Sequence, residues 1–402
     1  MGREELSECN LAVITASPTA GHKRQGFVLG KELRRLGCEN NLTEMTLDLA
    51  DSKGSFWAVA VMAVYLQLQK MPKTYETVIK VLDNPWIREE VKAGVRKTDY
   101  SAEVLTKLEN SENFDKERLT LFFPTHVMGE QAAIHLLEKK TLEAKIMAFV
   151  PDPWERPLLN TMVGVGIPDI NNRRYLVVHD EQTAEQIKKI RPGVAVYPLG
   201  TLSEPEHTSR EKPEIKWQEG QAVHVGIEFS GSEIPKFEEK VKEFIRTVCK
   251  QIISGEIRLT IHMMHHKQLE TRVKIFLGGL GLGDNANIRL IRNENMDEAI
   301  VTRSEYILGE GSSWGEPNAV ITKGGEVPLE DRAGQLAVCV YGGGHEGKDI
   351  EAGVREGHAI DMRKVDTDLW WKRITDELRR RSGGSFTYTR SLALEALKKI
   401  DY

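Results

Sequence analysis

The chain has 402 residues, of which 40% are hydrophobic and 29% charged, and its formal net charge is -5. This composition is ordinary for a globular protein, and the length allows two large domains. The weak negative charge gives no general electrostatic case for binding nucleic acid. The four cysteines lie far apart without a Cys-x-x-Cys spacing, which argues against a zinc ribbon or dense disulfide framework and favours a reduced cytoplasmic protein. No run of about 18 apolar residues is present, so a membrane span is not expected.

The first predicted element is a strand that begins at Leu11 and breaks into a loop of small residues ending in Gly21 and His22. A helical pattern follows over residues 24–36, and Gly37 is a natural stop. A junction of this kind points the first helical N–H groups, and the positive end of the helix dipole, toward a ligand above the sheet. His22 is therefore a candidate for proton transfer, although the same residues also suit a plain loop and helix cap.

Alternating strand and helix patterns continue through the first half of the chain. Strands are expected at 119–123, 145–150, 174–178 and 195–197, and helices at 129–138 and 181–189. Such alternation predicts a parallel sheet covered by helices. Residues 203–220 are polar and contain prolines, and we interpret them as a linker between domains.

The second half repeats the opening pattern. A strand at 222–229 leads into a loop, Ser230-Gly231-Ser232, and then a helix over 235–253. Further strands are expected at 257–261, 288–291, 306–308, 319–322 and 337–341. The sequence therefore predicts an α/β fold with two doubly wound, Rossmann-like domains, whose ligands lie beyond the carboxyl ends of the strands. We expect a first domain at 1–202, the linker at 203–220, a second domain at 221–366 and helices at 367–402.

Three histidines, His262, His265 and His266, follow or end the strand expected at 257–261. Three nearby histidines are typical of a metal site, but no carboxylate occurs at a spacing from them that would indicate a further metal ligand. We interpret them as loop residues, and no metal site is expected.

The most specific pattern lies near the C-terminus. It reads Ile321-Thr-Lys-Gly-Gly-Glu-Val-Pro-Leu-Glu-Asp-Arg-Ala-Gly-Gln-Leu336, followed by Gly344-His-Glu-Gly-Lys-Asp349. It resembles the nucleotide-sugar site of GT-B glycosyltransferases. The more specific likeness is to monogalactosyldiacylglycerol synthase, processive diacylglycerol glucosyltransferase and the N-acetylglucosaminyltransferase that acts on lipid I.

Further motifs occur in the order of that group, over about residues 10–360. Gly21-His22 resembles its Gly-Gly-His loop, and Phe149-Val-Pro-Asp152 resembles its Val-Thr-Asp turn. Asn295-Met296 resembles its Asn-Met before a short helix. The order of these motifs, rather than any one of them, carries the resemblance.

The resemblance implies a GT-B fold in which the N-terminal domain binds a hydroxyl acceptor and the C-terminal domain binds a nucleotide diphosphate sugar. Transfer would then occur across the cleft, without a bound metal or other cofactor. His22 would be the base, with Asp152 as a second candidate for that role. The donor would be held by small residues that let backbone N–H groups approach phosphate, by a ribose carboxylate and by carboxylates facing the sugar. These donor residues would be Ser230, Gly231, Ser232, His265, Gly324, Gly325, Asp331 (or Glu330), Glu346 and Asp349.

The phosphate loop departs from the pattern of that group. Glu326 and Pro328 stand where the group has Gly-Thr, and a carboxylate repels diphosphate while proline removes one donor. An alternative register uses Gly311, Ser312 and Ser313 as the phosphate loop and Glu316 as the ribose carboxylate. Both registers stay open at this point.

The segment 56–66 is apolar nearly all round, too short to span a bilayer, and followed by lysines up to residue 80. A buried helix is the first interpretation. The resemblance adds a second, peripheral contact of residues 56–80 with the inner face of a membrane. It also implies that the helices at 367–402 pack back on the first domain.

We therefore expect a cytoplasmic, metal-independent hexosyltransferase that moves a sugar from a nucleotide diphosphate donor, with UDP as the expected nucleotide. The acceptor would be a hydroxyl compound, with lipids as one class. Two alternatives remain: a nucleotide-sugar 2-epimerase on the same fold, and a non-catalytic GT-B-like binding protein. Glu326 and Pro328 favour the last of these.

Overall fold

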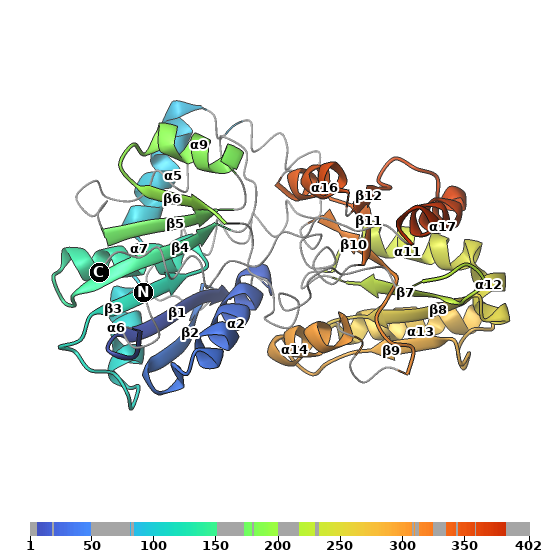
Figure 1. The fold of residues 1–402 in the computed structure, drawn as a ribbon, viewed down its shortest axis with the longest axis horizontal. Coiled ribbons are helices and arrows are strands. Elements are labelled where there is room, and N and C mark those ends of the chain that lie inside the picture. Colours follow the sequence, from blue (N-terminus) through green and yellow to red (C-terminus); the bar gives the residue numbers. More distant parts are fainter. Residues whose placement is uncertain are drawn as a thin grey trace. The chain divides into compact units, whose positions relative to one another are not determined.

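A computed structural model of the chain describes residues 6–17, 20–49, 81, 84–150, 173–178, 181–199, 217–229, 233–307, 309, 313–324, 335–342, 345–357 and 359–382. The described residues up to 199 belong to one compact unit, and those from 217 to 382 belong to a second (Figure 1). Each unit is described by itself.

The first unit contains a six-stranded sheet in the order β2-β1-β3-β4-β5-β6, and neighbouring strands in it pair in parallel. Its strands are β1 (Asn10–Ser17), β2 (Leu42–Asp48), β3 (Thr120–Pro124), β4 (Ala144–Val150), β5 (Arg174–Val178) and β6 (Ala195–Pro198). Its helices are α2 (Ala20–Arg35), α5 (Pro85–Lys97), α6 (Ser101–Glu109), α7 (Val127–Glu138) and α9 (Glu181–Ile190).

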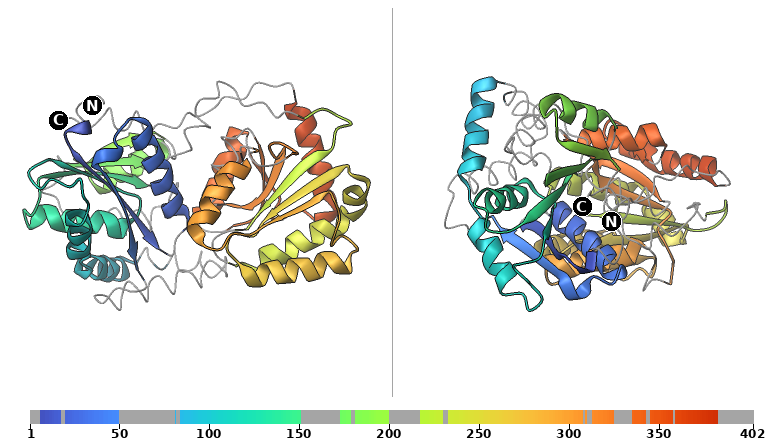
Figure 2. Two further views of the ribbon diagram at one scale, coloured as in Figure 1. Left: turned by 90° about the horizontal axis from the view of Figure 1, so that it is seen from below. Right: turned by 60° about the vertical axis from the view of Figure 1, so that its left-hand side comes forward.

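Alternate residues of β1 belong to different cores. Leu11 and Val13 pack in a cluster with residues of α2, whereas Ala12 and Ile14 pack in a second cluster with residues of α6 and α7. A strand that is buried on both faces must be apolar throughout, which is why this segment has no polar alternation. Helices therefore cover both faces of the sheet (Figure 2).

The second unit contains a parallel sheet in the order β9-β8-β7-β10-β11-β12. This order is that of a dinucleotide-binding Rossmann fold. Its strands are β7 (Val223–Glu228), β8 (Ile257–His262), β9 (Ile288–Ile291), β10 (Ala319–Lys323), β11 (Leu336–Tyr341) and β12 (Ala359–Asp361). Its helices are α11 (Pro235–Thr247), α12 (Cys249–Ser254), α13 (Lys267–Gly279), α14 (Met296–Ile307), α16 (His345–Glu356) and α17 (Trp370–Arg381).

The two faces of β7 differ in polarity. Val223, Val225 and Ile227 lie in the main apolar core of the unit. The alternate positions His224 and Glu228 are also buried but polar. Between them is Gly226, where an added Cβ would collide with the hydroxyl of Tyr306 on α14. The face covered by α14 is thus a polar core.

The expected fold class, two doubly wound α/β domains, is confirmed. The strand expected at 306–308 is wrong, because Tyr306 lies in α14 and Leu308 is outside the described residues. Asn295 begins this helix by accepting a hydrogen bond from the N–H of Glu298 at 2.9 Å. The helix expected over 235–253 is divided into α11 and α12.

Part of the C-terminal tail packs differently from the expectation that 367–402 returns to the first domain. Trp370, Ile374 and Leu378 of α17 lie in the core of the second unit, as does Trp217 from the expected linker. The spacing of four residues puts the three α17 side chains on one helix face, where Trp370 packs with its ring centroid 5.9 Å from that of Phe244. Residues 383–402 are outside the described residues.

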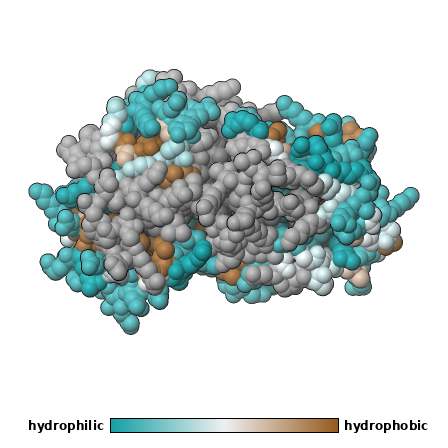
Figure 3. All heavy atoms as spheres, viewed as in Figure 1, coloured by the Kyte–Doolittle hydropathy of each residue, from teal (hydrophilic) through white to brown (hydrophobic). Residues whose placement is uncertain are grey.

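Within the described part of the chain, no helix is both long and apolar enough to cross a bilayer. On the face drawn in Figure 3 the described surface is mainly hydrophilic, with apolar residues in separate spots. The segment 56–80 lies outside the described residues.

Candidate functional site

The carboxyl ends of β1 and β3 lie side by side in the first unit, because the two strands pair in parallel with Ile14 opposite Pro124. The chain leaves β1 into α2 and β3 into α7. Strand β1 is also the point at which the strand order turns, since β2 lies on its other side. Ligands of doubly wound sheets bind beyond the strand ends at such a point. His22 in the first turn of α2 and Thr125 after β3 are both located there.

Two reciprocal hydrogen bonds join these residues. The Thr125 hydroxyl donates to the backbone carbonyl of His22 at 2.9 Å, and Nδ1 of His22 contacts the backbone carbonyl of Thr125. A carbonyl oxygen only accepts, so Nδ1 carries the hydrogen. In neutral His22 the lone pair that takes a proton is therefore on Nε2. The backbone thus fixes the tautomer that a general base needs.

A second histidine, His126, lies beside His22. The two rings meet edge to face, with centroids 4.7 Å apart and planes at 88°. His126 is the N-cap of α7, and its Nδ1 accepts a hydrogen bond from the N–H of Met128 at 3.2 Å. Desolvation, with a contribution from His22, holds the pKa of His126 well below its ordinary value. His126 is therefore neutral at neutral pH.

Sequence reasoning missed His126. It is separated from His22 by about a hundred residues, and the loop Pro124-Thr125-His126 contains no glycine that would mark a site. The available signal was a buried strand followed by a histidine at a helix start, as at His22 itself.

Two glycines let the helices approach β1 closely. An added Cβ at Gly26 on α2 would collide with the side chain of Thr15, and one at Gly129 on α7 would come within 2.8 Å of Ile14. Both helices therefore pack against β1 without an intervening side chain at these points. This close packing holds the first turns of α2 and α7, and the two histidines on them, at the sheet edge.

In the second unit the strand order turns between β7 and β10. Lys323 ends β10 and its Nζ contacts Oε1 of Glu346, in the first turn of α16, at 2.7 Å. Both side chains are largely buried, at 11% and 6% exposure. Gly324 follows, and a Cβ there would collide with the backbone carbonyl of Glu346. Burial, together with Glu346, raises the pKa of nearby Tyr341 to about 12.

A buried ionic network lies at the ends of β7 and β8. Oε2 of Glu228 is 3.0 Å from Nδ1 of His262 and 3.1 Å from Nε of Arg303 on α14. Nε2 of His262 is 3.2 Å from the amide oxygen of Asn293. Glu228 and His262 are fully buried. The interpretation of His262 as a loop residue without a carboxylate partner is therefore wrong, because His262 ends β8 and Glu228 lies opposite it on the neighbouring strand.

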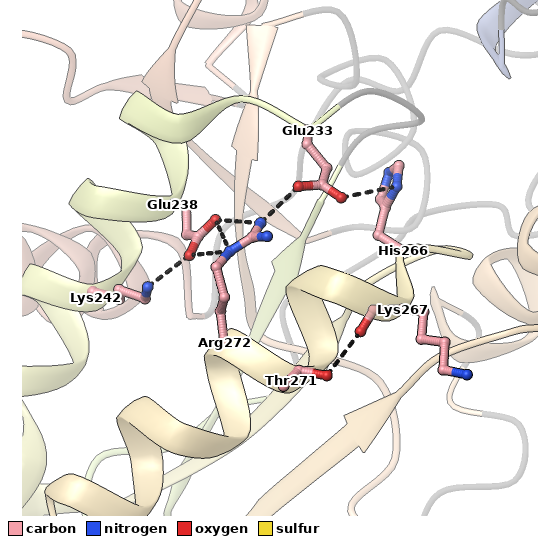
Figure 4. Close-up of polar contacts among 7 residues, drawn as sticks. All are labelled: Glu233, Glu238, Lys242, His266, Lys267, Thr271 and Arg272. Carbon is pink, nitrogen blue, oxygen red and sulfur yellow. Dashed lines mark hydrogen bonds and ion pairs between the residues drawn. The ribbon is translucent and has the colours of Figure 1, made fainter.

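His265 and His266 lie in the turn between β8 and α13, and His266 is located beside a surface ionic network (Figure 4). The preceding Met264 has a positive φ of 52°, a strained conformation for a residue with a side chain. Nδ1 of His266 is 3.8 Å from Glu233, which also contacts Arg272 at 2.6 Å. Burial and the adjacent His266 lower the pKa of His265.

The structure brings some of the expected site residues together. Gly324 and Glu346 meet at the carboxyl edge of the second sheet, His265 follows a strand end at the same edge, and Asp349 is on α16 one turn after Glu346. His22 is at the corresponding edge of the first sheet. The expected residues outside the described part of the chain are Asp152, Ser230, Gly231, Ser232, Gly311, Ser312, Gly325 and Asp331.

The described residues of the alternative donor loop are located elsewhere. Ser313 and Glu316 precede β10, whereas Gly324 follows it. The five residues of β10 span about 16 Å. Trp314 packs edge to face against His224, near the start of β7, and the N–H of Asn318 donates to the His224 carbonyl at 2.8 Å. Glu316 thus lies at the amino edge of the sheet, opposite Gly324 and Glu346.

Among the described residues, no group of three or more histidine, cysteine, aspartate or glutamate side chains is arranged to hold a metal ion.

No protein-family model and no curated protein sequence matches the chain. Solved structures of similar fold include Staphylococcus aureus MnaA with UDP, at 12% identity and a TM-score of 0.52, covering 96% of this chain and 94% of that one. A putative UDP-N-acetylglucosamine 2-epimerase from Listeria monocytogenes has 10% identity and a TM-score of 0.53, covering 97% and 95%. The UDP-GlcNAc 2-epimerase from Neisseria meningitidis bound to UDP-GlcNAc has 10% identity and a TM-score of 0.50, covering 97% and 98%. The two sheets and their helices thus form a GT-B fold.

Proposed function

We propose that the protein is an enzyme that moves a sugar from a nucleotide diphosphate sugar, with UDP as the nucleotide, to a hydroxyl acceptor. The observation that carries the proposal is the contact of His22 Nδ1 with the Thr125 carbonyl at the end of β3. A histidine held in this tautomer directs Nε2 to the role of general base. His22 would remove the proton of the acceptor hydroxyl as the bond to the sugar forms, and the nucleoside diphosphate would leave.

The donor is proposed to bind at the carboxyl edge of the second sheet. Lys323 supplies a cation for the diphosphate, and Gly324 allows the backbone to approach it. Glu346 is proposed to exchange its contact with Lys323 for the sugar hydroxyls. The position of Glu316 before β10 supports this register over the alternative loop 311–316.

A second candidate is a nucleotide-sugar 2-epimerase. Its support is the fold similarity to the S. aureus, L. monocytogenes and N. meningitidis structures, two of which contain UDP or UDP-GlcNAc. An epimerase would convert the nucleotide sugar without any acceptor, so the two functions differ in what the reaction requires.

The first experiment is calorimetric titration of the purified chain with UDP, GDP, ADP and their sugar conjugates. Micromolar, base-selective binding supports an enzyme, and no binding to any of them leaves the non-catalytic alternative. The second step follows bound sugars by mass spectrometry and NMR. If the sugar changes configuration when the nucleotide sugar is the only substrate present, the epimerase is supported. If UDP is released only when an acceptor is added, transfer is supported.

Two variants separate the sites. His22→Gln is expected to lower turnover by about a hundredfold or more while UDP affinity stays unchanged. Lys323→Met is expected to weaken binding of UDP and of UDP-sugars, because it removes the cation that the diphosphate needs. His135→Gln is the control, because His135 lies in the last turn of α7, away from the carboxyl edge of the first sheet, where it contacts Asp99 and Gln131. Full turnover in His22→Gln contradicts the assignment of the base.

The acceptor class is also a proposal. We infer that lipid hydroxyls are one class, with contact at the inner face of a membrane through residues 56–80. Support comes from α5, the next described helix along the chain, where Trp86 is 72% exposed and the last turn carries Arg96 and Lys97. Sedimentation with anionic vesicles tests this, and equal sedimentation with and without vesicles contradicts it.

A further inference from the structure

His126 makes two contacts that together exceed the needs of a helix cap. Its Nδ1 accepts the N–H of Met128, and its ring meets the His22 ring edge to face. Serine, threonine, aspartate and asparagine are the side chains that usually cap a helix, and each could accept the same hydrogen bond. None of them offers an aromatic ring to His22. The cap alone therefore does not account for an imidazole at this position.

The His22 ring is held on two sides by the segment that follows β3. The carbonyl of Thr125 holds its Nδ1–H, and the ring of the next residue, His126, packs against it at 88°. Thr125 is itself fixed, because its N–H donates to the Ile14 carbonyl of β1 at 3.0 Å. Thr125 is fully buried. One rigid segment therefore sets both the tautomer and the plane of the His22 ring.

We propose that His126 is a positioning residue for His22, which packs against the His22 ring, keeps its Nδ1–H on the Thr125 carbonyl and thereby aims Nε2 at the reacting hydroxyl. The inference rests on the proposed function for the role of Nε2, but the positioning itself is a property of the chain alone. His126 takes no proton in the reaction.

Among the described residues, few charged side chains lie beside the pair along α2 and α7. Within one helical turn of the pair, α2 carries Lys23 and Arg24, and α7 carries Glu130. Glu130 is ion-paired to Arg174 of β5 at 2.5 Å, so its charge is already balanced. The final residues of β1 and β3 are uncharged. A charge placed at position 126 would therefore act strongly on His22.

The test uses the full-length chain labelled with ¹⁵N-histidine. NMR correlation spectra read the tautomer and the pKa of His22, whose signals are assigned by their loss in His22→Gln. The variants are His126→Asn and His126→Asp, both of which are favoured N-cap residues and so keep the start of α7. His135→Asn, on the same helix, is the matched control. Thermal melting shows that each variant is folded.

In the unchanged chain we expect the Nδ1–H tautomer of His22 to dominate. His126→Asn is expected to give a mixture of tautomers and to lower kcat about ten- to hundredfold with unchanged KM for the nucleotide sugar. His126→Asp is expected to raise the pKa of His22 by about 1 or more, because it puts a carboxylate beside the ring. The acidic limb of the pH–rate profile should move upward with it.

The two levels of the proposal fail separately. The positioning role is overturned if the tautomer and the pKa of His22 are the same in three proteins: the unchanged chain, His126→Asn and His126→Asp. A changed tautomer with unchanged turnover supports the positioning of His22 and overturns its role as the base of the proposed function. Equal effects in His135→Asn would show a general response of α7 and also overturn the proposal.

Discussion

At the carboxyl edge of the first sheet, two histidines are held by a backbone carbonyl and a helix N–H, and His126 is kept neutral. At the same edge of the second sheet, the fixed side chains are charged and paired, as in Glu228 with Arg303 and Lys323 with Glu346. Two doubly wound parallel sheets, with different strand orders, thus carry two kinds of chemistry. A neutral histidine edge suits proton transfer, whereas a cation beside glycine suits a bound diphosphate.

The buried ion pairs give the largest test of this difference. Glu228→Gln leaves the Arg303 guanidinium buried without its carboxylate, and we expect a loss of about 3–5 kcal/mol in the free energy of unfolding of the second unit. Urea unfolding followed by tryptophan fluorescence measures it, since Trp217 and Trp370 lie in this core. Weaker UDP binding should accompany the loss, because Glu228 ends the central strand of the proposed donor edge.

The matched variant is Glu130→Gln in the first unit, where Glu130 is paired with Arg174 at 2.5 Å. A similar loss of stability is expected, but UDP affinity should be unchanged. If both variants weaken UDP binding equally, the assignment of the donor to the second edge is wrong.

A buried neutral histidine in the second unit gives a pH test. Burial lowers the pKa of His224 to about 4 from 6.5, so between these values the unfolded chain binds more protons than the folded one. Stability is therefore complete above pH 6.5 and falls by about 3 kcal/mol as the pH drops to 4. Urea unfolding at several pH values measures the slope.

The variant for this test is His224→Phe combined with Thr260→Val. The pair removes the 2.9 Å contact between the two side chains without leaving a buried hydroxyl unpaired. The phenyl ring can keep the edge-to-face contact with Trp314. An unchanged pH slope in this variant would assign the acid sensitivity to other groups, with His126 of the first unit as the next to test.

Close packing at the second edge gives a smaller effect. Gly324→Ala puts a Cβ against the Glu346 carbonyl and should cost about 1–3 kcal/mol of stability. It should also weaken UDP-sugar binding, because the first turn of α16 must move. Gly278→Ala on α13 is the control, since nothing lies within 4 Å of its added Cβ. Unchanged affinity in Gly324→Ala would separate this loop from the donor.

The sequence predicted the strands that form apolar runs and missed β2 and β12, two edge strands that contain polar residues. The strand at Leu11 is mainly apolar and was predicted. Strand β2 lies at the edge of the sheet, contains several polar residues and has only two buried side chains, and it was not predicted. The sequence does not predict that the polar side chains of β7 are buried, because polar residues normally indicate a solvent-exposed face. They are buried because α14 covers Glu228 with Arg303 and because Tyr306 and Trp314 pack against His224.

The site was predictable only where it is local in sequence. His22 stands in one junction of strand, loop and helix, which a linear pattern reveals. Its partner His126 is set by the pairing of β1 with β3, and Glu228 meets Arg303 through the position of α14. The local periodicity of a sequence does not predict the order of strands in a sheet or the position of a helix over it. The location of His22 at a strand end was therefore predictable, but its contact with His126 and the contact of Glu228 with Arg303 were not.

The surface network of Figure 4 gives the smallest effect and the finest test of the charged edge. Arg272 lies between Glu238 and Glu233, and the hydrogen bonds that it donates to these carboxylates raise its pKa above the ordinary range. Its side chain is 39% exposed, so Arg272→Gln should cost only about 0.2–1 kcal/mol, and less in high salt. Because Glu233 then loses its partner, it should turn toward His266 and add negative charge near the proposed phosphates. We therefore expect UDP binding to weaken slightly at low salt and to recover at high salt. Arg380→Gln, whose partner Glu377 lies on α17, is the control, and the same salt dependence there would exclude a specific effect of Arg272.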